Sequence, residues 1–227
     1  MIVRALHPWN VSYQQAVKIQ KELRKRLVFD LVLPTPKYVA GVDVSVSKGS
    51  RSGWAGVVVF SFPDLQVIEE QSAKGQVTFP YIPGLLSFRE IPLLCKAIER
   101  LTIQPDVFIC DGQGIAHPRR MGIATHLGIL LDKPTIGCAK SRLIGTHGQV
   151  GPRKGDYSPL MDNGEQVGVV LRTRKGVKPV FVSPGYGISL ADSRILVLSC
   201  TTKYRLPEPI RAAHNLVTRL RSCQGGA

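Results

Sequence analysis

Hydrophobic and polar residues follow a helical spacing near the start of the chain and strand-like spacings after it. Over residues 12–27, apolar side chains recur every three or four positions while lysines and arginines take the other faces, which predicts an amphipathic helix. Three β-rich runs follow at residues 38–46, 54–60 and 67–73, with turn-forming residues between them. This part of the chain predicts an antiparallel three-stranded meander.

The pattern then changes to an alternation of helices and strands. Helical spacing over residues 86–101 and 122–131 alternates with short apolar runs at residues 107–110 and 135–139. Such alternation is typical of parallel strands that are joined by right-handed helical crossovers. We therefore expect two parallel strands to extend the meander.

The last third of the chain predicts two further strands and two helices. The strands are expected at residues 167–173 and 179–182, on either side of a turn at Gly176. Three antiparallel strands and then two parallel strands give an α/β fold with a mixed five-stranded sheet flanked by helices, the order of the ribonuclease H-like architecture. No repeat or linker divides the sequence, so we expect a single domain over residues 1–227.

The charge balance indicates the kind of partner. The chain has 30 lysines and arginines against 16 aspartates and glutamates, a formal net charge of +14 at pH 7. This excess favours a polyanionic partner, either nucleic acid or an anionic membrane surface. No apolar run approaches the roughly 20 residues that span a bilayer, and the first residues lack the apolar core of a signal peptide. We expect a cytoplasmic monomer that has no membrane partner.

The cysteines and histidines do not predict a zinc site. The five cysteines are odd in number, have no C-x-x-C spacing and mostly lie in apolar runs, so we expect reduced and mostly buried thiols. The histidines have no H-E-x-x-H or Cys/His ligand spacing. We therefore expect any metal to be held by oxygen ligands.

Three acidic residues lie where a sheet could bring them together. Asp43 is in a β-rich run, on the face of Gly41, and by itself this pattern is typical of an ordinary solvated strand face. Asp111 directly follows the apolar run 107–110, at the edge where open α/β sheets bind ligands, although a turn-shaping role is the alternative. Glu90 is near the beginning of the next predicted helix, where it could simply interact with the helix dipole.

The expected ribonuclease H-like architecture would bring these three acids together. If the helix of Glu90 packs beside the first and fourth strands, its carboxylate converges with those of Asp43 and Asp111. Three such carboxylates repel one another unless a cation lies between them, and a hard divalent ion such as Mg²⁺ suits oxygen ligands. The sequence therefore predicts a metal site within a chain whose net positive charge attracts phosphates.

The motifs around these acids resemble those of the endonuclease V family. They are Pro80-Tyr81-Ile82-Pro83-Gly84, Phe88-Arg89-Glu90, Asp111-Gly112-Gln113-Gly114, His117-Pro118-Arg119-Arg120, Gly137-Cys138-Ala139-Lys140-Ser141 and Leu206-Pro207-Glu208-Pro209. The resemblance implies a ribonuclease H-like fold and a dependence on Mg²⁺, for which Mn²⁺ can substitute. It also implies recognition of deoxyinosine in DNA and hydrolysis of the second phosphodiester bond on its 3′ side, leaving a 3′-hydroxyl and a 5′-phosphate.

The resemblance also assigns roles to single residues. It implies that Asp43, Glu90 and Asp111 hold the metal and that His214 completes the catalytic site. It implies that Lys140 contacts the scissile phosphate. Without the resemblance, His214 would be read as an ordinary helix histidine and Lys140 as a solvated lysine.

The proline-rich motif predicts how the base is held. Pro80 and Pro83 stiffen the loop, so that Tyr81 and Ile82 can form a wedge in the gap left by a flipped base; a buried turn is the alternative. Fixed backbone groups could then select hypoxanthine over adenine, because deamination makes O6 an acceptor and N1 a donor. The substrate-binding residues implied by the resemblance are Tyr81, Ile82, Pro83, Gly84, Leu86, Gly112, Gly114, His117 and Ile123.

Other functions remain open at this point. An endoribonuclease specific for inosine would have the same motifs, because contacts to a 2′-hydroxyl cannot be read from the sequence. A non-catalytic basic module would use the same groove, but it would be expected to lack the three acids. A glycosidase is disfavoured by the charge of +14 and by an aromatic content of only 7%.

Overall fold

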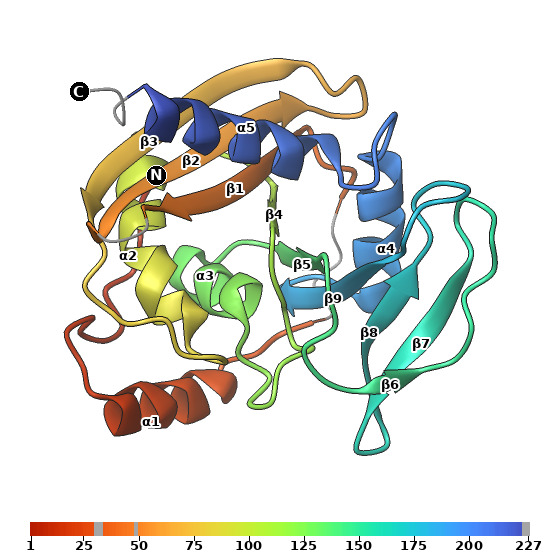
Figure 1. Cartoon of the computed structure of the whole chain (residues 1–227), viewed down its shortest axis with the longest axis horizontal. Coiled ribbons are helices and arrows are strands. Elements are labelled where there is room, and N and C mark those ends of the chain that lie inside the picture. Colours follow the sequence, from red (N-terminus) through yellow and green to blue (C-terminus); the bar gives the residue numbers. More distant parts are fainter. Residues whose placement is uncertain (30–33, 48–49, 224–227) are drawn as a thin grey trace.

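A mixed sheet of nine strands runs through the described part of the chain, residues 1–29, 34–47 and 50–223 of the computed structural model (Figure 1). The strand order is β3-β2-β1-β4-β5-β9-β8-β7-β6. The antiparallel pairs β3–β2 and β2–β1 are followed by the parallel pairs β1–β4 and β4–β5, as predicted. These strands are β1 (Tyr38–Val46), β2 (Ser52–Ser61), β3 (Val67–Gln76), β4 (Val107–Cys110) and β5 (Thr135–Ala139).

The sheet continues beyond the five predicted strands. β9 (Val180–Tyr186) is antiparallel to β5, and β8 (Glu165–Leu171), β7 (Tyr157–Asp162) and β6 (Thr146–His147) follow it, each antiparallel to the last. Strands near β8 and β9 were predicted, but they were not expected to belong to the same sheet as β1 to β5. β7 and β6 were not predicted, because Pro159 within β7 is unfavourable in a sheet interior and β6 has only two residues.

The described residues form five helices, none of which is both long and apolar enough to cross a membrane. Four of these helices cover the two faces of the sheet, whereas the first packs against the third. α2 and α3 pack on one face, and α4 and α5 on the other, with α5 lying along β1 and β2 (Figure 1). The bounds are α1 (Tyr13–Arg24), α2 (Leu86–Ile98), α3 (Ile123–Leu131), α4 (Leu190–Ser199) and α5 (Glu208–Ser222). The mixed α/β fold and all the predicted helices are confirmed.

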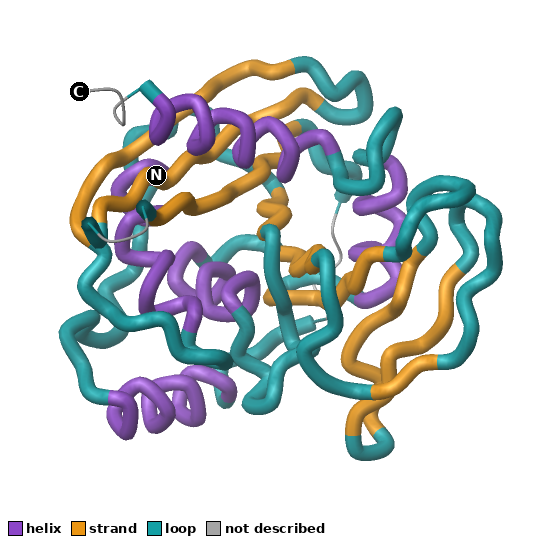
Figure 2. Tube along the Cα trace, viewed as in Figure 1, coloured by secondary structure: helices purple, strands orange, loops and turns teal. Residues whose placement is uncertain are grey.

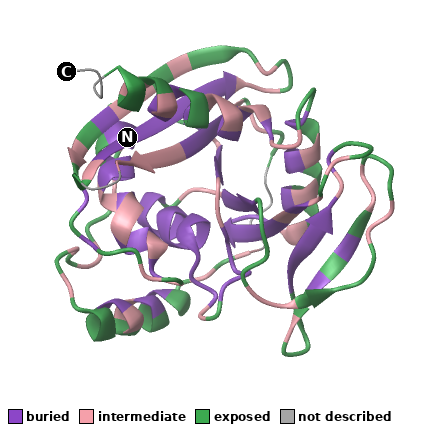
Figure 3. Ribbon diagram, viewed as in Figure 1, coloured by how far each residue is buried: buried purple, intermediate pink, exposed green. Residues whose placement is uncertain are grey.

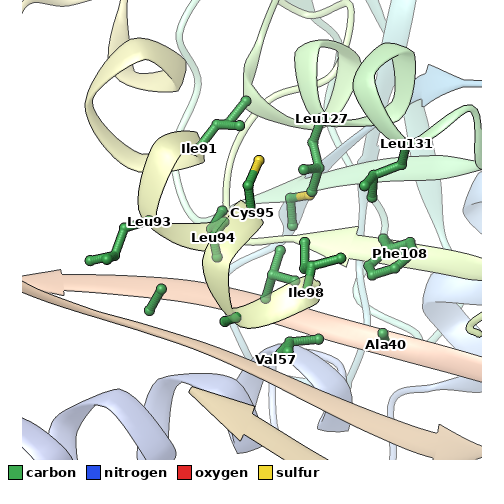
Figure 4. Close-up of a cluster of buried hydrophobic side chains, with 14 of the residues drawn as sticks. Ala40, Val57, Ile91, Leu93, Leu94, Cys95, Ile98, Phe108, Leu127 and Leu131 are labelled. Carbon is green, nitrogen blue, oxygen red and sulfur yellow. The ribbon is translucent and has the colours of Figure 1, made fainter. Parts of the chain in front are cut away.

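The alternation of side chains along the strands divides the core between these two layers. Figure 3 shows that the central strands and α3 are largely buried. Ala40 and Phe108 point toward α2 and α3, whereas Val39 and Ile109 point toward α4 and α5. Each fully buried large apolar side chain contributes roughly 1.5–3 kcal/mol. Figure 4 shows side chains of the first layer, among them Val57, Ile91, Leu94, Ile98, Leu127 and Leu131.

The thiols are free, as predicted. Cys95, Cys110, Cys138 and Cys200 are buried, and Cys223 is exposed. Burial raises the pKa of the Cys95 and Cys200 thiols to about 12, so both stay protonated and unreactive at neutral pH.

A close backbone contact holds α5 against β1. A Cβ atom at Gly41 would lie 2.0 Å from the carbonyl oxygen of Pro209, so only glycine fits here. Asp43 is two residues farther along β1 and therefore on the same face as Gly41. The face that could have been solvated is covered by α5, which brings His214 beside Asp43.

Candidate active site

A pocket of about 300 Å³ opens where the chain leaves β4 and β5. Its walls come from the segments 81–87, 111–123 and 139–143, much of which Figure 2 draws as loops. Pockets for small ligands begin at roughly this size. The predicted substrate-binding residues that line it are Tyr81, Ile82, Pro83, Gly84, Leu86, Gly112, His117 and Ile123, and Asp111 and Lys140 line it as well.

Gly114 is not among the lining residues of this pocket. Its N–H donates to Ser183 Oγ at 2.8 Å, and a Cβ atom at this position would lie 2.1 Å from the carbonyl oxygen of Pro184. Gly114 therefore lets the loop after β4 pack closely on β9, and it supports the pocket from behind.

The carbonyl oxygen of Gly84 ties three parts of the pocket together. It accepts hydrogen bonds from Gln20 Nε2 at 3.0 Å, His117 Nε2 at 3.0 Å and Arg119 Nη2 at 2.7 Å. Gly84 itself has a φ of +79°, in the left-handed region that favours glycine. The loop before α2 is thereby fixed to α1 and to the loop after β4.

His117 is held as one neutral tautomer. Since its Nε2–H donates to Gly84, its Nδ1 accepts from the backbone N–H groups of Arg119 at 3.1 Å and Met121 at 3.3 Å. Burial lowers the pKa of His117 to about 4, and the nearby Arg119 and Arg120 act in the same direction. His117 is therefore a fixed, uncharged wall of the pocket at neutral pH.

The tip of the proline-rich loop is open to solvent. Tyr81 is 70% exposed, and Pro83 is exposed beside it. The alternative of a buried turn is therefore wrong for Tyr81. An exposed aromatic ring on a stiff loop at the mouth of a pocket is available to contact a ligand.

Asp43 in β1 and Asp111, which directly follows the neighbouring β4, lie at the same level. Val42 of β1 is the register partner of Cys110, the last residue of β4, and the next residue along each segment is an aspartate. Glu90 reaches the same region from α2, and the charges of both aspartates act on it. The three predicted acids therefore lie close enough to interact.

The surroundings of two of these acids raise their pKa. Burial, and then the charges of Asp43 and Asp111, raise the pKa of Glu90 to about 8. Burial also raises the pKa of Asp43, and the charge of Asp111 adds to this, whereas a hydrogen bond from His214 opposes it.

The two other predicted catalytic residues each contact one of these aspartates. His214 Nδ1 lies 2.8 Å from Asp43 Oδ2, across 171 positions of sequence. The ammonium group of Lys140 forms an ion pair with Asp111. Val44 N–H donates to the other Asp43 oxygen at 2.8 Å, which fixes the orientation of that carboxylate.

The donor set fits a hard divalent cation in its chemistry. Within the described residues, no three His, Cys, Asp or Glu side chains lie close enough together to form a ready-made metal-binding cluster. Glu90 nevertheless has no hydrogen-bonding partner for its carboxylate in the described chain, and it faces two like charges. A cation between these oxygen ligands would relieve that repulsion.

The raised pKa of Glu90 predicts a stability that depends on pH and Mg²⁺. The carboxyl group has an ordinary pKa of 4.5 in the unfolded chain and a pKa of about 8 in the folded protein. The folded state therefore binds the proton more tightly, and the free energy of unfolding falls as pH rises through this window. Mg²⁺ binding would release the proton, so its stabilising effect should be larger near pH 8 than near pH 6. Thermal melts with and without Mg²⁺ measure both effects. Glu90→Gln should flatten the pH slope, and an unchanged response to Mg²⁺ in this variant would contradict the prediction.

Some residues of the site were not predicted from the sequence. Ser87, Gln113, Met121 and Arg142 line the pocket, and Gln20 supports it from α1. Ser87 and Gln113 lie inside or beside the quoted motifs, which could have indicated them. Gln20 has no such signal, because it lies in an ordinary amphipathic helix.

The geometry has counterparts among solved structures. The endonuclease V of Streptomyces avermitilis has a TM-score of 0.92 and 40% identity, covering 100% of both chains. The endonuclease V of Ciona intestinalis, solved in complex with a 24mer DNA containing an inosine followed by a ribo-adenosine, has a TM-score of 0.82 and 30% identity over 93% of this chain and 98% of that one. The ribonuclease H-like fold class is confirmed.

The sequence comparisons point to the same family. The endonuclease V of Trichormus variabilis is 52% identical over 213 residues, which is 93% of this chain and 96% of the relative. The endonuclease V family model matches residues 20–215, a span that includes the pocket, the three acids and His214. Since sequence and structure agree over most of the chain, this protein is a nuclease and belongs to the endonuclease V family.

Proposed function

We propose that this protein cuts DNA beside deoxyinosine, hydrolysing the second phosphodiester bond on the 3′ side and leaving a 3′-hydroxyl and a 5′-phosphate. The observation that carries the proposal is the position of Asp111, which belongs both to the acid group and to the wall of the pocket. A base held in the pocket would place its backbone beside the acids. The complex of the Ciona protein with inosine-containing DNA supports this substrate class.

The pocket is suited to a base that has left the helix. Glycines at positions 84 and 112 allow backbone groups to approach a base closely, and the neutral His117 adds no charge to the wall. Tyr81 at the mouth can occupy the gap in the duplex. An inosine pair opens more easily than a normal pair, which favours the damaged base.

The acids would hold Mg²⁺, or Mn²⁺ in its place, with Asp43, Glu90 and Asp111 as ligands. When bound, such an ion supplies Lewis acidity and lowers the pKa of a bound water. His214 orients Asp43 through the hydrogen bond between them. Lys140 can exchange Asp111 for a phosphate oxygen, because its ammonium group is partly exposed beside the pocket.

A labelled duplex with one deoxyinosine tests the proposal. In Mg²⁺, a nick at the second phosphodiester bond is expected, with none in an inosine-free duplex. A matched oligonucleotide that has ribose around the inosine tests the sugar, and faster cleavage of that strand would indicate an endoribonuclease instead. Binding without a cut in either Mg²⁺ or Mn²⁺ would contradict the nuclease proposal and favour a binding module.

A further inference from the structure

A chain of hydrogen bonds leads from the N-terminal segment to the wall of the pocket. His7 Nδ1 lies 2.8 Å from the carbonyl oxygen of Pro8, and His7 Nε2 lies 2.7 Å from His126 Nε2. His126 Nδ1 lies 3.0 Å from Ser87 Oγ. Ser87 lines the pocket, so the chain ends where a base would be held.

The chemistry of the partners determines where each proton lies. The carbonyl of Pro8 can only accept, so His7 Nδ1 must donate to it. Burial lowers the pKa of His7 and lowers that of His126 well below its ordinary value, so both rings are neutral. His7 Nε2 is then an acceptor and His126 Nε2 donates to it, which leaves His126 Nδ1 as an acceptor.

The hydroxyl proton of Ser87 follows from this order. Since His126 Nδ1 can only accept, Ser87 Oγ–H donates to it. The hydroxyl hydrogen of Ser87 therefore points to His126, and the lone pairs of Ser87 Oγ remain free to accept hydrogen bonds from other partners. No other hydrogen bond to Ser87 Oγ is made within the described residues, although Ser87 is only 2% exposed.

Tight packing keeps the two histidines in place. The ring of Trp9 contacts His7 with centroids 4.4 Å apart and stacks on His126 at 5.5 Å. Phe88, the residue after Ser87, lies edge-on to His126 at 5.2 Å. The rings therefore cannot turn freely, and the order of donors and acceptors is fixed with them.

We propose that Ser87 is a specificity-determining residue whose oxygen accepts a hydrogen bond from N1–H of the flipped base, with His126 and His7 as positioning residues. The inference rests on the proposed function. Hypoxanthine in a nucleoside has one N–H donor, at N1, whereas N1 of adenine is an acceptor. An acceptor-only serine therefore matches inosine and opposes the lone pair of adenine N1.

A cleavage assay with two bases tests the role of Ser87. Deoxyinosine offers N1–H, whereas purine deoxyriboside has an acceptor at N1 and no donor. Ser87→Ala should lower kcat/KM for deoxyinosine by about 5- to 10-fold, the effect of one hydrogen bond. The same variant should not lower kcat/KM for purine deoxyriboside, because the oxygen that it removes opposes the N1 lone pair of that base. Ser193→Ala is the matched control, because Ser193 is another buried helix serine whose hydroxyl donates to Ser189 O at 2.7 Å, and it should change neither rate.

Variants of the histidines test the positioning. His126→Phe and His7→Phe keep an aromatic ring but break the chain, so the Ser87 hydroxyl can turn and donate to the base. Cleavage of purine deoxyriboside should then rise while that of deoxyinosine falls, an inversion that a loss of packing alone would not produce. His7 is only partly buried, so its variant keeps the test valid if His126→Phe does not fold.

The outcomes separate this inference from the proposed function. If the unmodified protein does not cut deoxyinosine, both are overturned. If it cuts deoxyinosine, but Ser87→Ala and the control Ser193→Ala have the same ratio of the two rates, only the inference is overturned. Equal losses on both bases in the histidine variants would likewise contradict the positioning role.

Discussion

Asp43→Asn is expected to abolish cleavage of inosine-containing DNA, with roughly a 10³-fold or greater fall in kcat/KM. Asp43 is the acid that β1 contributes to the group, and it is oriented by both His214 and Val44. An amide keeps the shape of the side chain but removes a negative ligand. The predicted metal site would then have two acids instead of three.

The same substitution should leave the cation-free fold intact. Burial disfavours the charge of Asp43, and the neighbouring Asp111 adds to that cost. Removing the charge should therefore keep or raise the melting temperature. A loss of activity without a loss of stability would show that Asp43 is retained for chemistry and not for folding.

A nicking assay and a thermal melt together check this prediction. Asp64→Asn is the control, because Asp64 is exposed in the turn after β2 and neither lines the pocket nor acts on the acids. The variant Asp43→Asn should still bind the inosine duplex, which fluorescence anisotropy can measure. Cleavage by this variant within about tenfold of the unmodified protein would overturn the assignment of Asp43.

Gly41→Ala should destabilise the protein by about 3 kcal/mol or more. The added Cβ atom would lie 2.0 Å from Pro209 O and 2.7 Å from Ile210 N, which are backbone atoms that no side-chain rotation can move away. The N-terminal turn of α5 would have to shift from β1. Because α5 carries His214, the nuclease activity should fall together with the stability.

Urea unfolding measures this effect on the free energy of unfolding. Gly148→Ala is the matched control, since the nearest atom to its Cβ would be the side-chain oxygen of Ser158 at 3.3 Å, and a change within about 1 kcal/mol is expected. If Gly41→Ala were as stable as this control, α5 would not be held to β1 at this contact.

Much of the fold follows from local patterns in the sequence. The strands at 38–46, 107–110 and 135–139 have the predicted bounds, because their apolar runs end abruptly at polar or glycine residues. The parallel pairing of β1 with β4 then brings Asp43 and Asp111 to one level without further information. The extension of the sheet beyond β5 was harder to predict from the sequence, since β7 contains a proline and β6 is very short.

Local sequence patterns could predict only part of the site. Nothing in the helical pattern of 208–222 distinguishes His214, and its place beside Asp43 depends on how closely α5 approaches Gly41. The chain from His7 to Ser87 joins segments that are 119 and 39 positions apart. Local spacing carries no information about such contacts, because tertiary packing alone brings these side chains together.

The hydrogen bond between Asp43 and His214 also has a consequence for biosynthesis. The two residues are 171 positions apart, so a chain made from its N-terminus presents Asp43 to solvent long before His214 has been added. The strands β1 to β5 and the pocket can form during this interval, since domains begin to fold while they are being synthesised. Cutting activity is therefore expected to appear only late in translation, after α5 has left the ribosome and docked on β1.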